Sequence, residues 1–134
     1  MRYLMPLLIL LAGCKAEPTE KLYRVAGKAL VEGNPVPSGN VTFYPDASKG
    51  NGTPHLPMAV IDATGGYELS VPGGRKGAPA GWYKVVVFAA DNPQPGKPVR
   101  FFVDQIYTNV DTTPLRVEVI AEPEPKRYDL SLVR

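Results

Sequence analysis

Prolines and glycines interrupt this chain so often that most of it cannot form a long helix. The 134 residues include 15 prolines and 13 glycines. From Leu22 onward these residues separate short runs of Val, Ile, Tyr and Phe, and no stretch keeps a helical period of apolar residues. Because proline and glycine favour turns and short apolar runs favour strands, the sequence predicts an all-β domain.

The alternation of apolar and polar residues predicts short strands. The pattern is clearest after Trp82, where Tyr83, Val85 and Val87 share one side of the strand and are expected to point into a core. Strands are predicted at 22–31, 40–44, 58–62, 67–71, 82–90, 115–120 and 127–133. Seven strands at this spacing are typical of an antiparallel β-sandwich with Greek-key connections.

Two connections affect how these strands would be arranged. The turn at 63–66 indicates a tight hairpin between the strands on either side of it. The segment from Asp91 to Pro114 is longer than most loops in compact domains. Pairing of Val99 to Val103 as a short edge strand would shorten that loop.

The N-terminus has the layout of an export signal. Arg2 precedes an apolar run that ends at Leu11. The small residues Ala12 and Gly13 follow, directly before Cys14. Signal peptides have this charged start, apolar middle and small-residue cleavage site. The run is too short to span a bilayer, which needs about 20 helical residues, so the sequence predicts a signal helix ahead of the folded domain.

The sequence Leu11-Ala12-Gly13-Cys14 resembles the lipobox of bacterial lipoproteins. In that family the cysteine sulfur receives a diacylglycerol, the chain is cut before the cysteine, and the new amino group is usually acylated. A thiol is the best nucleophile for accepting the lipid, and several acyl chains anchor a protein more firmly than one. The resemblance implies lipidation of Cys14. The alternatives are a secretory signal followed by a coincidental cysteine, or a buried cysteine without function.

These features divide the chain into three parts. Residues 1–13 are the predicted lipoprotein signal peptide, residues 14–21 the lipidated cysteine and a tether, and residues 22–134 one β domain. Lys15 occupies the position where enterobacterial lipoproteins of the inner membrane have aspartate. The resemblance therefore favours the outer membrane over the inner membrane of the cell envelope. Because the chain has one cysteine, its domain has to fold on an apolar core without an internal disulfide.

Several motifs in the predicted domain resemble carboxypeptidase-regulatory-like and transthyretin-like domains. In chain order they are Val25-x-Gly27, Gly33-Asn34-Pro35-Val36, Val41-Thr42-Phe43-Tyr44, Asp62-Ala63-Thr64-Gly65-Gly66-Tyr67 and Pro79-Ala80-Gly81-Trp82-Tyr83. The region from Ile106 to Val119 looks like the C-terminal part of small planctomycete-type lipoproteins that carry this domain. The resemblance extends over about residues 22–134 and implies a transthyretin-like or immunoglobulin-like β-sandwich held at a membrane.

Candidate catalytic and metal-binding residues are few. His55 is the only histidine, and it lies in a loop rich in proline and glycine. A zinc site needs three or four ligands from Cys, His, Asp and Glu, and a catalytic triad would need His55 beside Ser48 and Asp46. Asp62 has too few carboxylates near it for calcium, so a hydrogen bond within its turn is expected. The sequence predicts no enzyme, cofactor or metal site, and a hydrolase using His55 is the remaining enzymatic alternative.

One face of the predicted domain could bind a ligand, because exposed apolar patches can mark partner surfaces. Its candidate residues are Tyr44, Trp82, Val86 and Phe88. We expect instead that the segment 91–114 folds over this face, with Phe101 and Phe102 as the covering residues.

Together these features predict a lipid-anchored, non-enzymatic envelope protein with a binding or structural module. Its partners would be the membrane, through the lipid on Cys14, and an envelope protein or a glycan. The alternative is a carbohydrate- or peptide-binding accessory module that uses Trp82 and Tyr44. The 15 basic and 13 acidic residues are scattered along the chain, so we expect no nucleic-acid partner.

Overall fold

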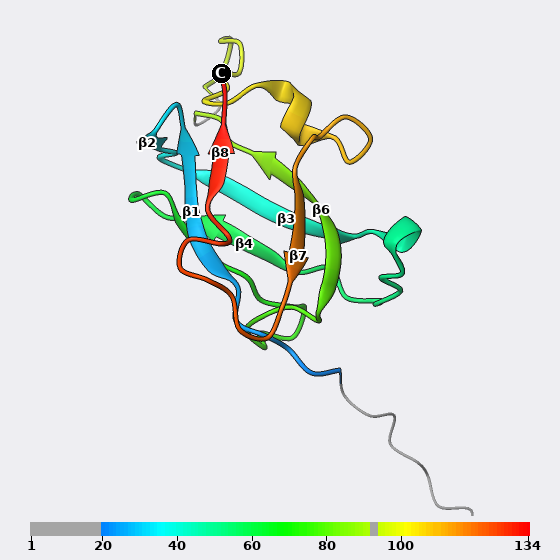
Figure 1. Ribbon diagram of the computed structural model, residues 1–134. Helices are drawn as coiled ribbons and strands as arrows, with labels where there is room; N and C mark the ends of the chain where they lie inside the picture. Colours follow the sequence, from blue (N-terminus) through cyan, green and yellow to red (C-terminus); the bar gives the residue numbers. More distant parts are fainter. Residues whose placement is uncertain (1–19, 92–93) are drawn as a thin grey trace, which may run out of the picture.

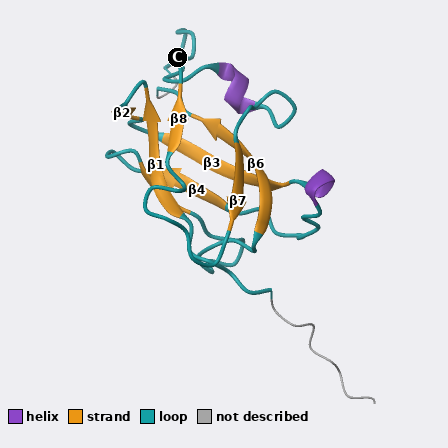
Figure 2. Ribbon diagram, in the orientation of Figure 1, coloured by secondary structure: helices purple, strands orange, loops and turns teal. Residues whose placement is uncertain are grey.

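Eight strands and two short 3-10 helices are found in residues 20–91 and 94–134, the part of the chain that the computed structural model describes (Figure 1). The predicted signal helix, the lipobox and Cys14 lie outside these residues. Strands predominate over helices in the described part (Figure 2), so the prediction of an all-β domain is confirmed. None of its helices is long and apolar enough to cross a membrane.

The strands form two four-stranded sheets. They are β1 (Ala26–Val31), β2 (Asn34–Pro35), β3 (Gly39–Pro45), β4 (Met58–Ile61), β5 (Gly66–Glu68), β6 (Gly81–Phe88), β7 (Arg116–Val119) and β8 (Leu130–Leu132), and the helices are η1 (Ala47–Lys49) and η2 (Gln105–Thr108). In one sheet β1 pairs with β2, β5 and β8, and the other sheet has the order β4-β3-β6-β7. Each predicted strand range overlaps one of these strands, and β2 is the one that was not predicted.

Side chains from both sheets contribute to one hydrophobic core. Figure 1 shows β1 and β8 in front of β3 and β4, and buried residues of all these strands belong to the same cluster. The predicted inward residues Tyr83, Val85 and Val87 are all fully buried in it. Burial of alternate residues along β6 therefore follows the sequence pattern closely, because successive side chains of a strand point to opposite faces.

Two buried tyrosines connect the core to the backbone around it. The Tyr83 ring lies 5.5 Å from the Phe43 ring, and its hydroxyl donates a hydrogen bond to the carbonyl of Pro79 at 2.7 Å. The Tyr67 hydroxyl donates to the carbonyl of Tyr128. Burial raises the pKa of both Tyr67 and Tyr83, because it disfavours the charged phenolate.

The pairing of β1 with β8 differs from the predicted, wholly antiparallel arrangement. These two strands run parallel, with Ala29 opposite Leu130. They are the first and last strands of the described domain, so the rest of the chain forms the long connection that a parallel pair needs. The prediction is wrong here because alternation shows which face of a strand is buried but not the direction of its neighbour.

The hairpin predicted around residues 63–66 forms only at its two ends. The amide of Asp62 donates to the carbonyl of Gly66 at 2.9 Å, and Met58 and Ser70 exchange backbone hydrogen bonds of 2.9 and 3.0 Å. Between these points the two strands diverge, since β4 pairs with β3 and β5 pairs with β1. The predicted hairpin therefore links the two sheets instead of forming a continuous ladder.

The long segment after β6 is attached to the domain by one bridge and by its own apolar residues. Phe101 pairs with Ala90 in a single antiparallel bridge, so the pairing expected for residues 99–103 occurs at one position. Val103 and the η2 residue Tyr107 are buried in the core. Figure 1 shows η2 above the upper end of β6.

Gly27 allows β1 to approach the C-terminal segment closely. A Cβ atom at this position would collide with the carbonyl of Tyr128 and lie 3.1 Å from the amide nitrogen of Asp129. In the neighbouring residue, the Lys28 amide donates to Oδ1 of Asp129 at 2.9 Å. The absence of a side chain at Gly27 is thus what lets the first strand and the end of the chain pack together.

We predict that Gly27→Ala lowers the free energy of unfolding by about 1–3 kcal/mol, the usual cost of forcing extra atoms into a packed interior. The obstructing atoms belong to the backbone and cannot rotate away. Urea denaturation measures the effect. Gly52→Ala is the matched control, because a Cβ there meets nothing within 4 Å. Equal stability of Gly27→Ala and the wild type would contradict the close packing of β1.

Candidate functional site

The predicted ligand-surface residues lie together on one side of the β4-β3-β6-β7 sheet. Cross-strand pairing places Phe88 opposite Asn40, Val86 opposite Thr42, and Lys84 opposite Tyr44. The same pairing extends to β4, where Val60 lies opposite Asn40 and Met58 opposite Thr42. We call this surface the outer face; it consists of Asn40, Thr42, Tyr44, Met58, Val60, Trp82, Lys84, Val86 and Phe88.

Large apolar side chains of the outer face are open to solvent. Met58 and Phe88 are each 45% exposed and Val60 is 79% exposed. Neighbouring apolar side chains with this exposure form the kind of patch that can mark a partner surface. Met58 and Val60 were not among the predicted ligand residues. Strand parity could have identified both, since inward-pointing Ala59 and Ile61 leave them on the opposite side.

The segment after β6 covers only one end of the outer face. The Phe101 ring meets the Phe88 ring edge to face, with 5.6 Å between ring centroids. Phe102 packs against the core instead. The expectation that this segment buries the whole face is wrong. Its residues Val103 and Tyr107 are buried in the core, so the segment packs against the core instead of across the face.

Trp82 lies at the other end of the outer face, and the ammonium group of a lysine lies over its ring. The ammonium of Lys49 is 4.0 Å from the centroid of the Trp82 ring, a geometry in which the ring attracts the cation. Asn51 also donates to the carbonyl of Trp82 at 2.9 Å. A sugar or peptide that stacks on this side of the indole would have to displace Lys49.

A carboxylate fixes the short helix that carries Lys49. Oδ1 of Asp46 accepts hydrogen bonds from the Ser48 hydroxyl at 2.5 Å and from the Ser48 amide at 3.2 Å. The hydroxyl bond is the main cause that lowers the pKa of Asp46, and Lys84 and Lys49 lower it further. Asp46 and Ser48 therefore serve the local structure of η1.

A cleft of about 440 Å³ opens beside β4, where the predicted hairpin divides. Its lining consists of Asn40, Thr42, Met58, Ala59, Val60, Glu68 and Ser70. The carboxylate of Glu68 binds Arg24 at 2.9 Å and Lys76 at 3.2 Å. Hydrogen bonds from Lys76 and Arg24 lower the pKa of Glu68. The cleft combines an apolar wall with amide, hydroxyl and carboxylate groups, which suits a ligand with hydroxyl or amide groups.

His55 contacts the N-terminal end of the described chain. Its Nε2 atom lies 3.6 Å from a carboxylate oxygen of Glu20, and the same oxygen accepts a hydrogen bond from the Thr53 hydroxyl at 2.5 Å. Ser48 is bonded to Asp46 and not to His55. These partners differ from the relay of hydrogen bonds that a catalytic triad requires.

Asp62 binds the backbone of its own turn, as predicted. Oδ1 of Asp62 accepts hydrogen bonds from the Thr64 hydroxyl at 2.6 Å, the Thr64 amide at 2.8 Å and the Gly66 amide at 3.0 Å. The hydroxyl bond and then the two amide bonds lower the pKa of Asp62. Over residues 20–91 and 94–134, no three His, Cys, Asp or Glu side chains are grouped closely enough to hold a metal ion.

Comparison with known proteins does not identify a family or a function for this chain. No protein-family model matches the chain, and neither a curated protein nor a solved structure matches it. The resemblances to lipoproteins and to carboxypeptidase-regulatory-like domains therefore rest on the motifs quoted above.

We predict that the Asp62 carboxylate stabilises the domain at neutral pH more than at acid pH. Since the pKa of Asp62 is lowered in the folded protein, its contribution is complete above the unfolded value of about 3.9 and is lost as the pH falls through the folded value. Asp62→Asn should lower the urea midpoint at neutral pH and approach the wild type in acid. Asp111→Asn, an exposed control, should change little. An Asp62→Asn difference that does not vary with pH would refute this role.

Proposed function

We propose that this protein is a lipid-anchored, non-enzymatic protein of the cell envelope whose β domain is a binding or structural module. The observation that carries the proposal is the sequence Leu11-Ala12-Gly13-Cys14 directly after an apolar run. The described domain begins at Glu20, six residues after Cys14. Six residues reach about 20 Å when fully extended, so a lipid on Cys14 would keep the domain close to the membrane.

The polar side chains with displaced pKa values support a scaffold more than an active site. Enzymes tend to gather such groups in one cleft. Here the Asp46 carboxylate accepts a hydrogen bond from Ser48 in η1, and the Asp62 carboxylate accepts one from Thr64 in the turn after β4. The Tyr83 hydroxyl donates a hydrogen bond to the carbonyl of Pro79. These three groups lie in different elements, and each has a structural partner, as does Glu68 beside the cleft, which pairs with Arg24 and Lys76.

We further infer that the two sheets form a β-sandwich of the transthyretin-like or carboxypeptidase-regulatory-like type, with Greek-key connections. Repeated passage of the chain between the sheets supports this architecture, for example from β2 to β3 and from β4 to β5. The hydrogen bond from Tyr83 to Pro79 resembles the tyrosine corner of sandwich domains. Both residues belong to one of the motifs that carry the resemblance.

A second candidate function is that of an accessory module that binds a carbohydrate or a peptide. Exposure of Met58 and Val60, which line the cleft beside β4, favours it. Because Lys49 occupies the Trp82 ring, the ligand would contact the β4 side of the outer face. Glycan or peptide binding that is saturable and lost in a folded Val60→Ser variant would favour this function over a purely structural one.

We predict that the mature protein carries a diacylglycerol on Cys14 and an acyl group on its new amino terminus, and fractionates with the outer membrane, as Lys15 favours. Cys14→Ser replaces the sulfur nucleophile with a hydroxyl and should lose the added mass. Mass spectrometry of the N-terminal peptide from membrane extracts measures this. If the wild-type and variant peptides differ only by the exchanged atom, the protein is not a lipoprotein.

A further inference from the structure

We propose that the domain contacts anionic lipid headgroups through the end from which its N-terminal segment emerges. The residues concerned are Lys21, Arg24, Arg75 and Lys76, and we call this surface the basic end. The inference rests on the proposed lipidation of Cys14 and deepens it, because it states which surface of the domain faces the membrane. An anchor by itself would leave that orientation open.

Backbone hydrogen bonds join the two segments that form the basic end. The amide of Tyr23 donates to the carbonyl of Ala78, and the amide of Ala78 donates to the carbonyl of Tyr23, both at 2.9 Å. Gly77, with φ +107°, precedes this bridge and lies so close to the Tyr23 carbonyl that a Cβ atom would collide with it. The chain before β1 and the loop at 72–77 are therefore held side by side.

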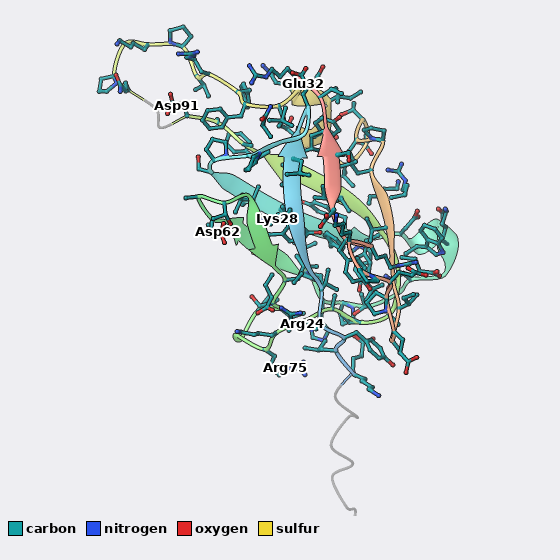
Figure 3. The ribbon with its side chains drawn as sticks, turned by 60° about the vertical axis from the view of Figure 1, so that its left-hand side comes forward. Arg24, Lys28, Glu32, Asp62, Arg75 and Asp91 are labelled. Atoms are coloured by element: carbon teal, nitrogen blue, oxygen red, sulfur yellow. The ribbon has the colours of Figure 1, made fainter. Side chains whose placement is uncertain are left out.

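The basic end lies where the chain continues toward Cys14. Figure 3 shows Arg24 and Arg75 at the end of the domain where the described chain begins, and Glu32 and Asp91 at the opposite end. Basic side chains thus lie at the end of the domain where the first described residues follow the proposed lipidation site in the sequence.

The cationic groups of this surface are accessible. The side chains of Arg24 and Lys76 are each 78% exposed although both pair with Glu68, and Arg75 is exposed as well. The charged residues here are Lys21, Arg24, Arg75 and Lys76 against Glu20 and Glu68, four positive and two negative, which leaves a net charge of +2. Anionic headgroups attract such clusters, and a basic patch strengthens lipid anchoring.

The acidic residue that borders the basic end has a partner of its own. Glu124 lines a hollow together with Arg24. Its carboxylate pairs with Arg127 at 3.2 Å, and a hydrogen bond from its own backbone and then the Arg127 guanidinium lower its pKa. The charge of Glu124 is therefore offset by Arg127 rather than by the cations of the basic end.

Contacts at Glu20 limit how far the basic end can be from the membrane. The Glu20 carboxylate accepts a hydrogen bond from the Thr53 hydroxyl at 2.5 Å and lies 3.6 Å from Nε2 of His55. The chain is thus attached to the domain as far out as Glu20, and only residues 15–19 separate it from Cys14. At full extension this distance is about 20 Å, so headgroups are within reach of the basic end.

The test uses the full protein extracted from membranes and two kinds of vesicle, one of phosphatidylcholine alone and one that also contains phosphatidylglycerol. Flotation with each kind of vesicle reports the anchor. Amide hydrogen exchange of residues 72–78 reports the basic end. We expect flotation with both vesicles, and exchange that is severalfold slower on the anionic vesicles, with the difference removed by high salt because screening weakens the attraction.

Charge-removing variants identify the surface. In Arg75→Gln/Lys76→Gln the difference in exchange between the two vesicles should disappear while flotation is kept. Lys97→Gln/Arg100→Gln removes the same charge beside Asp91, at the opposite end, and should keep the difference. Loss of the difference in both double variants would show an effect of net charge alone and would overturn the proposed surface.

The outcomes separate the basic end from the anchor. Flotation with both vesicles but equal exchange on both would overturn the basic end and leave the anchor standing. Salt-sensitive flotation with anionic vesicles only would support the basic end and contradict lipidation. Flotation with neither vesicle would contradict both proposals.

Discussion

The close contact between β1 and the C-terminal segment holds the described domain together. With a single cysteine in the chain, closure has to come from packing and hydrogen bonds. Gly27 lets the two backbones approach, and the Lys28 amide binds the Asp129 carboxylate. Because β1 also pairs with β2 and β5, one strand links three others and continues into the N-terminal segment.

Two surfaces result from this arrangement, the outer face and the basic end, and Glu68 contacts residues of both. The outer face stays open because the segment after β6 is drawn into the core by Val103 and Tyr107. The basic end arises because backbone hydrogen bonds between Tyr23 and Ala78 join the chain before β1 to the loop that follows β5. Glu68 lines the cleft beside β4 and pairs with Arg24 and Lys76. Headgroups that compete for these two cations would free its carboxylate, so membrane contact would alter the charge at the cleft.

Strand positions could be predicted from the sequence, whereas strand partners could not. Alternation is a local signal, and the residues it places inward in β6, such as Tyr83 and Val85, are buried. The parallel pairing of β1 with β8 depends on residues far apart in the chain, for which alternation carries no information. The same holds for Lys49 over Trp82. The position of Lys49 follows from the geometry of η1. Its ammonium group covers one face of the Trp82 ring, which was predicted as a ligand contact.

Native-state amide hydrogen exchange is the most direct test of the role given to the contact between β1 and β8. The amide of Glu32 donates to the carbonyl of Leu132 at 3.0 Å. If this contact holds the domain together, that amide and those of β8 should exchange only through global unfolding, with the free energy found for β6 and for urea denaturation. Exchange of the β8 amides through local opening, at a clearly lower free energy than β6, would contradict the account.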